Sequence, residues 1–133
     1  MKTLLAGAAI GLGVCGAIAA ASIATAQIPG PQAKAPDGAA LFRQQCGTCH
    51  TTNMSEPFRQ GPPLAKIVGQ HAGRTEGFRY SQGFSQADFA WDEPKLDAWL
   101  TNPQTVIPGA VMAYRQAKPE VRMAIIAYLK ELN

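Results

Sequence analysis

Apolar residues recur at helical spacing in the segment WDEPKLDAWLTNP. Leu96, Trp99 and Leu100 fall on one face of a helix drawn through it, and polar residues fill the other face. Asp92 can accept a hydrogen bond from a free amide of the first turn, whereas Pro103 cannot continue a helix. The pattern therefore predicts a helix between Asp92 and Pro103 with one buried face.

A second helical pattern closes the chain. The segment KPEVRMAIIAYLKELN begins with Pro119, a residue that suits the first turn of a helix. Its apolar residues then follow at helical spacing: Val121, Ile125, Tyr128 and Leu129. We expect this helix to bury that side against the rest of the domain.

A third and shorter helix is expected over the segment GAALFRQQC. Asp37 can cap it, and Leu41 and Phe42 supply its apolar side. Because so short a helix is marginal by itself in water, it must be held by packing.

The remaining chain has no lasting period. Between Thr48 and Ala90, glycine and proline interrupt every pattern, and the segment TVIPGAVMAY turns around Pro108 and Gly109. The sequence thus predicts an all-α domain of three to five short helices joined by long loops. So much irregular chain in a small domain usually wraps around something else, and a large bound cofactor would fill that role.

The first 26 residues have the composition of an export signal. After Lys2 no charge appears until Lys34, and the run between them is apolar and rich in alanine and glycine. It ends in Ala24-Thr25-Ala26, the small–x–small pattern that signal peptidase recognises. We expect cleavage after Ala26. The alternative is an uncleaved membrane anchor, because the run is long enough to span a bilayer.

The expected export signal also sets the domain boundaries and the compartment. Residues 27–36 contain three prolines and form an extended lead-in, and residues 37–133 have room for one domain. We predict a periplasmic protein or, in the anchored alternative, a domain that faces the periplasm. The net charge of +3 and the lack of a basic stripe argue against nucleic-acid binding.

Export would discard Cys15, which leaves Cys46 and Cys49 in the stretch QQCGTCHTT. An iron–sulfur cluster normally needs four thiolates and is excluded. A zinc site would have to recruit His50 and the distant His71, without the usual paired ligand spacing. A disulfide-exchange dithiol would begin a helix after a strand, whereas these cysteines close a helix.

Covalent haem attachment uses every residue of this motif. Cys46 and Cys49 can each form a thioether with one haem vinyl group. His50, directly behind the second cysteine, then becomes an axial ligand of the haem iron. The motif predicts one covalently bound haem c.

The second axial ligand must come from elsewhere in the chain. Met112 is the best candidate, because the Pro-Gly turn before it can point its thioether inward. Met54 is too close to the attachment motif to reach the other haem face. Met123 belongs to the last helix, and His71 lies in a glycine-flanked loop where histidine is usually exposed.

From about Gly38 to its end, the chain resembles the small class I cytochromes c of bacteria and mitochondria. The resemblance is carried by ordered blocks: GAALFRQQCGTCH, GPPL, GFRYS, NPQTVIPGAVMAY and IIAYLKE. It implies the class I cytochrome c fold, in which the first and last helices cross. The crossing would bring Gly38 and Phe42 against Ile125 and Tyr128.

The resemblance also implies roles around the haem. His50 and Met112 resemble the two axial ligands, and Pro62 resembles the proline whose carbonyl accepts a hydrogen bond from the histidine Nδ1–H. Tyr80 and Trp91 match two aromatic residues that donate hydrogen bonds to a buried haem propionate.

The sequence departs from the family at several positions. Trp99 stands where the family often has a tyrosine near the methionine sulfur, and its indole N–H can still donate. Gln70 replaces an arginine and Ala110 a threonine that face the propionates, and Phe84 replaces an asparagine, which makes the pocket drier. Lysines that ring the haem edge in mitochondrial members are replaced by Gln104, Thr105 and Val111.

The function implied is that of a one-electron carrier and not of an enzyme. Its donor would be a quinol-oxidising complex or a dehydrogenase, and its acceptor a terminal oxidase or reductase. We expect the carrier itself to be a monomer. Two alternatives stay open: a dedicated haem subunit of a periplasmic dehydrogenase, and a small haem peroxidase or ligand sensor. The second requires Met112 to leave the iron readily.

Overall fold

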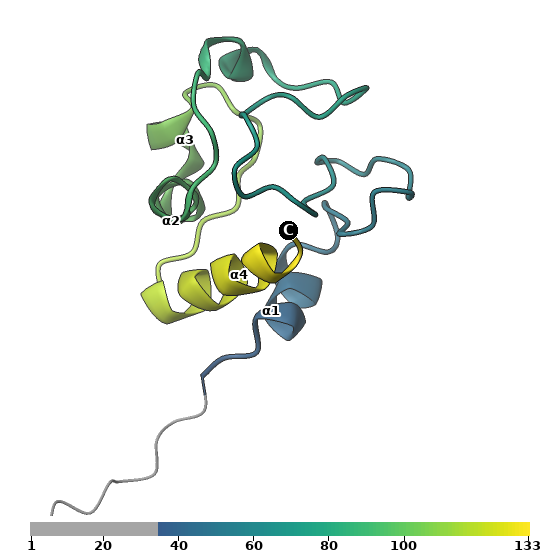
Figure 1. The fold of residues 1–133 in the computed structure, drawn as a ribbon. Coiled ribbons are helices and arrows are strands. Elements are labelled where there is room, and N and C mark those ends of the chain that lie inside the picture. The colour runs from purple at the N-terminus through teal and green to yellow at the C-terminus, as the bar shows by residue number, and fades with distance from the viewer. Residues whose placement is uncertain (1–34) are drawn as a thin grey trace, which may run out of the picture. The chain divides into compact units, whose positions relative to one another are not determined.

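The computed structural model describes residues 35–133, which form short helices joined by long loops (Figure 1). The elements are α1 (Gly38–Gln45), the 3-10 helix η1 (Gln82–Gln86), α2 (Glu93–Thr101), α3 (Pro103–Val106) and α4 (Pro119–Glu131). In this part of the chain the β-structure amounts to one isolated bridge between His71 and Ala90. The all-α prediction is therefore confirmed. The expected export signal and most of the lead-in lie outside the described residues.

No helix within residues 35–133 combines the length and the apolar run that crossing a bilayer requires. The buried apolar residues instead form one cluster that draws on α1, α2, α4 and the loops between them. Helix α4 contributes Ile125, Ile126 and Leu129, and α2 contributes Leu96 and Leu100. The helices thus serve to enclose a single interior.

Helix α1 ends at the first cysteine of the attachment motif. The Asp37 side chain accepts a hydrogen bond of 3.0 Å from the Ala40 N–H, as its position in the sequence predicted. Phe42 is the buried residue of the helix. The Cys46 N–H donates to the Phe42 carbonyl at 2.8 Å and closes the last turn. Burial of Phe42 therefore also sets where the cysteines lie.

Helices α1 and α4 cross in close contact, as predicted (Figure 1). A Cβ on Gly38 would lie 2.1 Å from the carbonyl oxygen of Ala124, so only glycine permits this separation. Phe42 of α1 and Tyr128 of α4 also pack their rings together, with centroids 5.6 Å apart. The two ends of the domain are joined at this point.

Helix α2 is capped as expected, since the Asp92 side chain accepts from the Lys95 N–H at 2.7 Å. The prediction for the following segment was wrong in part. Pro103 does end α2, but it also occupies the first turn of α3, in a segment expected to be loop. The Asn102 side chain caps this short helix by accepting from the Gln104 N–H at 3.3 Å. Proline lacks the N–H that a first turn leaves unpaired, so one residue can stop a helix and start the next.

Helix α4 begins at Pro119, as predicted, but its buried face differs from the apolar pattern. Val121 and Tyr128 are only half-buried, whereas Arg122 is buried. The Arg122 guanidinium donates to Asp97 of α2 at 2.7 Å. It also donates to backbone carbonyls of the segment that precedes α4, at 3.0 and 3.1 Å. A charged residue thus joins α2, α4 and the loop between α3 and α4.

Candidate functional site

A mostly apolar cavity of ≈ 390 Å³ lies inside the domain, between α1, the loops and α4. Its volume falls within the range of pockets that hold cofactors. Every residue that the sequence nominated for the site lines this cavity: Cys46, Cys49, His50, Pro62, Tyr80, Trp91, Trp99 and Met112. Residues spread over more than half of the described chain are thereby gathered around one space.

The two cysteines are presented by a turn that continues from α1. The N–H groups of Cys49 and His50 donate to the Cys46 carbonyl at 3.0 and 2.9 Å. The Cys49 thiol donates to the Gln60 side chain at 3.3 Å. Burial, and then the neighbouring Cys49, raise the pKa of the Cys46 thiol to about 11. A disulfide-exchange enzyme needs a lowered thiol pKa, so this environment disfavours that reading of the motif.

The ring of His50 is held by the backbone. Its Nδ1 lies 2.8 Å from the Pro62 carbonyl oxygen, and a carbonyl can only accept, so Nδ1 carries the proton. Nε2 is then the nitrogen with a free lone pair. Burial lowers the pKa of His50, and the hydrogen bond to Pro62 only partly opposes that effect. A neutral imidazole with a fixed ring is the form that binds a metal ion.

The loop between α3 and α4 brings Met112 to the same cavity. Met112 is half-buried and packs against the core cluster. The other candidates lie elsewhere: Met54 and Met123 are 57% and 60% exposed, and neither lines the cavity. His71 also lies outside the lining, and its Nδ1 is 4.0 Å from an Asp88 carboxylate oxygen. His71 is therefore not placed to complete a zinc site with the thiols.

Aromatic rings pack in tilted and edge-to-face contacts along one side of the cavity. The ring centroids of Tyr80 and Phe84 are 4.7 Å apart, those of Phe84 and Trp99 5.8 Å, and those of Trp99 and Trp91 5.3 Å. The two indoles are buried. The Tyr80 hydroxyl accepts from the Thr75 N–H at 3.3 Å and keeps its own proton to donate. The rings make a stiff, dry wall with polar edges.

The cavity suits a large apolar group that carries hydrogen-bond acceptors. Ser81 lines it, and the buried Ser81 hydroxyl has no partner within residues 35–133. A buried hydroxyl without a partner is costly, which indicates that a ligand atom completes it. Arg79 also lines the cavity and offers a positive charge to a carboxylate. Haem, with its apolar ring and two propionates, fits this combination. Gln70 and Ala110, which replace polar residues of the family pattern, do not line the cavity.

Four contributors to the site were missed by sequence reasoning: Gln60, Gly61, Arg79 and Ser81. Gly61 is one of them, because a Cβ there would lie 2.2 Å from the His50 ring. The signal was present in the GPPL block, of which only Pro62 was given a role. Gln60, Arg79 and Ser81 were also missed, since a single polar residue in an irregular loop gives no pattern that points inward.

Comparison with known proteins identifies a family and several relatives. The family model for cytochrome c matches residues 35–133. A cytochrome c of Kluyveromyces lactis is 34% identical over 105 residues, which cover 77% of this chain and 96% of the relative. A cytochrome c of Cannabis sativa is 34% identical over 76% of this chain and 92% of its own length. One from Ulva intestinalis is 36% identical over 77% of this chain and 91% of its own length.

Proposed function

The chain belongs to the cytochrome c family, and on that premise we propose that it carries single electrons on a haem whose iron is bound by His50 and Met112. As a member of this family, the chain binds covalently attached haem c and is an electron carrier and not an enzyme. The bound haem supplies a one-electron couple between Fe(II) and Fe(III). The chain's own residues determine how the haem is held and which redox partners can reach it.

The observation that carries the proposal is the orientation of His50. The Pro62 carbonyl accepts a hydrogen bond from Nδ1–H at 2.8 Å, which restrains the ring and leaves Nε2 as the nitrogen with a free lone pair, in a residue that lines the cavity. Cys46 and Cys49 lie on the same turn and supply the two thioethers. This arrangement supports His50 as the proximal ligand.

Met112 is proposed as the distal ligand because it is the one methionine among the described residues that lines the cavity. A thioether ligand favours Fe(II), and a dry wall penalises the additional charge of Fe(III). Both effects raise the reduction potential. If His50 and Met112 both bind the iron, no coordination site would remain for oxygen or another substrate, which disfavours a peroxidase or sensor function.

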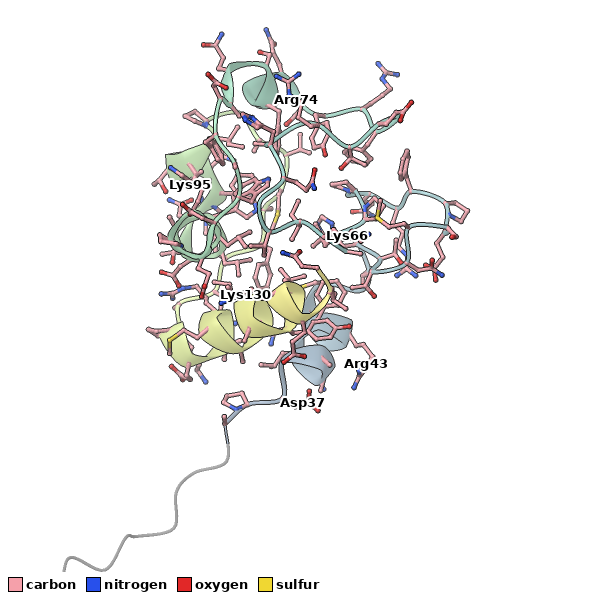
Figure 2. All side chains as sticks on the ribbon, in the orientation of Figure 1. Asp37, Arg43, Lys66, Arg74, Lys95 and Lys130 are labelled. Carbon is pink, nitrogen blue, oxygen red and sulfur yellow. The ribbon has the colours of Figure 1, made fainter. Side chains whose placement is uncertain are left out.

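The partners proposed are redox proteins that meet the cavity mouth briefly. Val111 lines the cavity and is 82% exposed, so the mouth carries an apolar side chain open to a partner. Figure 2 shows the labelled cations Arg43, Arg74 and Lys95 well apart from one another, at the lower right, the top and the left of the view. These features support small, transient docking that depends little on charge. The proposed donor is a quinol-oxidising complex or dehydrogenase, and the acceptor a terminal oxidase or reductase.

The proposed place of action is the periplasm. It is supported by the apolar, uncharged N-terminal run and its Ala-Thr-Ala end, which favour export and cleavage after Ala26. Covalent attachment suits such a compartment, because haem cannot then be lost by dilution. The intact mass of the secreted protein tests both points, since cleavage and haem addition change it by different amounts.

Optical spectroscopy tests the ligand assignment. The full chain is expressed with a cytochrome c maturation system, and the oxidised protein is examined for the weak near-red band of Met–Fe(III). We expect the band in the unaltered protein, its loss in Met112→Ala, and binding of carbon monoxide by that reduced variant alone. Met123→Ala is the matched control, because Met123 is exposed and lies outside the cavity. A near-red band that survives in Met112→Ala contradicts the proposal.

A further inference from the structure

A polar bridge joins the end of α1 to the loop that carries Met112. The Tyr114 hydroxyl donates to the side-chain oxygen of Gln45, and the Gln116 amide donates to the same oxygen at 3.1 Å. The Gln116 amide also donates to the Tyr114 hydroxyl at 3.2 Å, so the three side chains form a closed triangle. Gln45 directly precedes Cys46. The bridge thus spans from the haem-attachment turn to a residue two positions after Met112.

The far end of this bridge is itself firmly held. The Gln116 N–H donates to the Leu100 carbonyl at 2.8 Å, and its side-chain oxygen accepts from the Lys118 N–H at 3.0 Å. The buried Arg122 guanidinium donates to the Gln116 carbonyl at 3.0 Å. Gln45 therefore connects α1 to a segment already fixed on α2 and α4.

A second glutamine holds the other side of Met112. The Gln104 amide donates to the Ala110 carbonyl at 2.6 Å, and its oxygen accepts from the Gly109 N–H at 3.0 Å. Between the two anchored points lie residues 111–113, for which the described part of the chain provides no hydrogen bond. Met112 is therefore held from both ends and not by bonds of its own.

The position of the bridge explains why it matters for the cavity. Gln45, Tyr114, Met112 and Val111 all line the cavity, so the Gln45–Tyr114 bond lies at the cavity wall beside the methionine. If that bond opens, Tyr114 is released from α1 and the unbonded stretch 111–113 can move outward. A loop with few bonds of its own is the expected place for local opening.

We propose that Gln45 is a positioning residue that keeps Met112 in the haem pocket, by accepting the hydrogen bonds of Tyr114 and Gln116. This inference rests on the proposed His50–Met112 ligation and adds the device that holds the loop closed. This connection involves no charged group: the side-chain oxygen of Gln45 joins the Met112 loop to α1, the helix that ends at the attachment motif.

Competition by imidazole measures how often the loop opens. Added imidazole binds the oxidised iron only when Met112 is off, so its apparent affinity rises in proportion to the open fraction. Gln45→Ala removes the acceptor of two hydrogen bonds, and we expect imidazole to bind about 5- to 30-fold more tightly. The matched control is Gln44→Ala on the same helix, whose exposed side chain makes no hydrogen bond within the described chain, and which should leave the affinity unchanged.

Two further variants separate positioning from a general loss of stability. Gln45→Glu retains an acceptor oxygen and should stay within about threefold of the unaltered protein. Tyr114→Phe removes one donor and should also tighten imidazole binding, and in the double variant Gln45→Ala/Tyr114→Phe the effects should be much less than additive. If Gln45→Ala fails to fold, imidazole binding by Tyr114→Phe still tests the proposal.

Each result decides between the two proposals. A near-red band in the unaltered protein that is lost in Met112→Ala supports the ligation, independently of Gln45. If that holds and Gln45→Ala binds imidazole no better than Gln44→Ala, the positioning role is overturned. The positioning role is also overturned if the effects of Gln45→Ala and Tyr114→Phe on imidazole affinity are additive. It is likewise overturned if Gln45→Glu binds imidazole as tightly as Gln45→Ala does. Absence of the near-red band in the unaltered protein overturns the ligation and with it this inference.

Discussion

The Nδ1 of His50 lies 2.8 Å from the carbonyl oxygen of Pro62. The backbone passes close to the same imidazole ring at the preceding residue, Gly61. A Cβ at position 61 would lie 2.2 Å from the ring atom Cε1. The hydrogen bond thus forms only because the chain passes the imidazole at a residue without a side chain.

Gly61→Ala should displace the His50 ring. We expect a free energy of unfolding lower by about 1–3 kcal/mol, the usual cost of overpacking, together with a changed haem spectrum. Denaturant unfolding and the optical spectrum check the two effects. The control is Gly69→Ala, where nothing lies within 4 Å but φ is +85°, so that only backbone strain is added. If both variants keep the spectrum of the unaltered protein, the close approach to His50 is not a constraint.

Gly38→Ala should loosen the crossing of α1 and α4. The added Cβ would lie 2.1 Å from the Ala124 carbonyl oxygen and 2.9 Å from the Tyr128 Cβ. Although alanine favours helix more than glycine does, we expect a net loss of about 1–3 kcal/mol in the free energy of unfolding. Gln44→Ala on the exposed side of α1 should change it by no more than about 0.5 kcal/mol. Equal stability of the two variants would contradict a tight crossing.

Arg122→Met should destabilise the domain far more than loss of an exposed lysine. The Arg122 side chain is 10% exposed, lies 2.7 Å from Asp97, and donates to two backbone carbonyls that lose this donor in the variant. Because Asp97 is 43% exposed, we expect a loss of about 2–4 kcal/mol, somewhat below that of a fully buried pair.

The exposed pair of Lys130 and Glu93 is the comparison for Arg122. Their side chains are 47% and 56% exposed, so Lys130→Met should cost about 0–1 kcal/mol in unfolding free energy. Arg122→Lys should recover only part of the loss, because one ammonium group cannot reproduce the guanidinium fork. Comparable losses for Arg122→Met and Lys130→Met would mean that burial of Arg122 has no energetic consequence.

The loop after the attachment motif should add acid sensitivity through Glu56. A hydrogen bond from the Thr51 hydroxyl, at 2.7 Å, and the nearby Arg59 guanidinium hold the pKa of Glu56 below its usual 4.5. A carboxyl whose pKa is lower in the folded state stabilises that state above pH 4.5. This contribution is lost as the pH falls through the folded value.

Glu56→Gln should therefore be less stable than the unaltered protein at neutral pH and equal to it in acid. Unfolding by denaturant at several pH values measures the difference. Glu131→Gln, at the exposed end of α4 and outside the ion pairs of the described chain, should show no such dependence. A difference that persists unchanged to low pH would point to a packing effect of Glu56 and not to its charge.

The starts of the helices followed from local sequence. Asp37, Asp92 and Pro119 act within one turn of their own positions, so their effects do not depend on the rest of the fold. The short helix α3 did not follow, because four residues are too few to show a period. Burial of Arg122 was missed for a different reason: a charged residue is buried only when another element supplies its partner, and Asp97 lies on α2.

The sequence by itself determined the chemistry of the site: two thiols and an imidazole in one turn, and a methionine after a Pro-Gly turn. The two thiols and the imidazole act through their own atoms, and the single turn that carries them sets their spacing. Only the tertiary structure decided what surrounds them. Gln45 and Tyr114 are 69 residues apart, and Ser81 has no feature that marks its hydroxyl as buried. Such contacts arise when α1 and α4 cross and the loops close over the interior, a geometry that depends on many weak packing interactions and on no short segment alone.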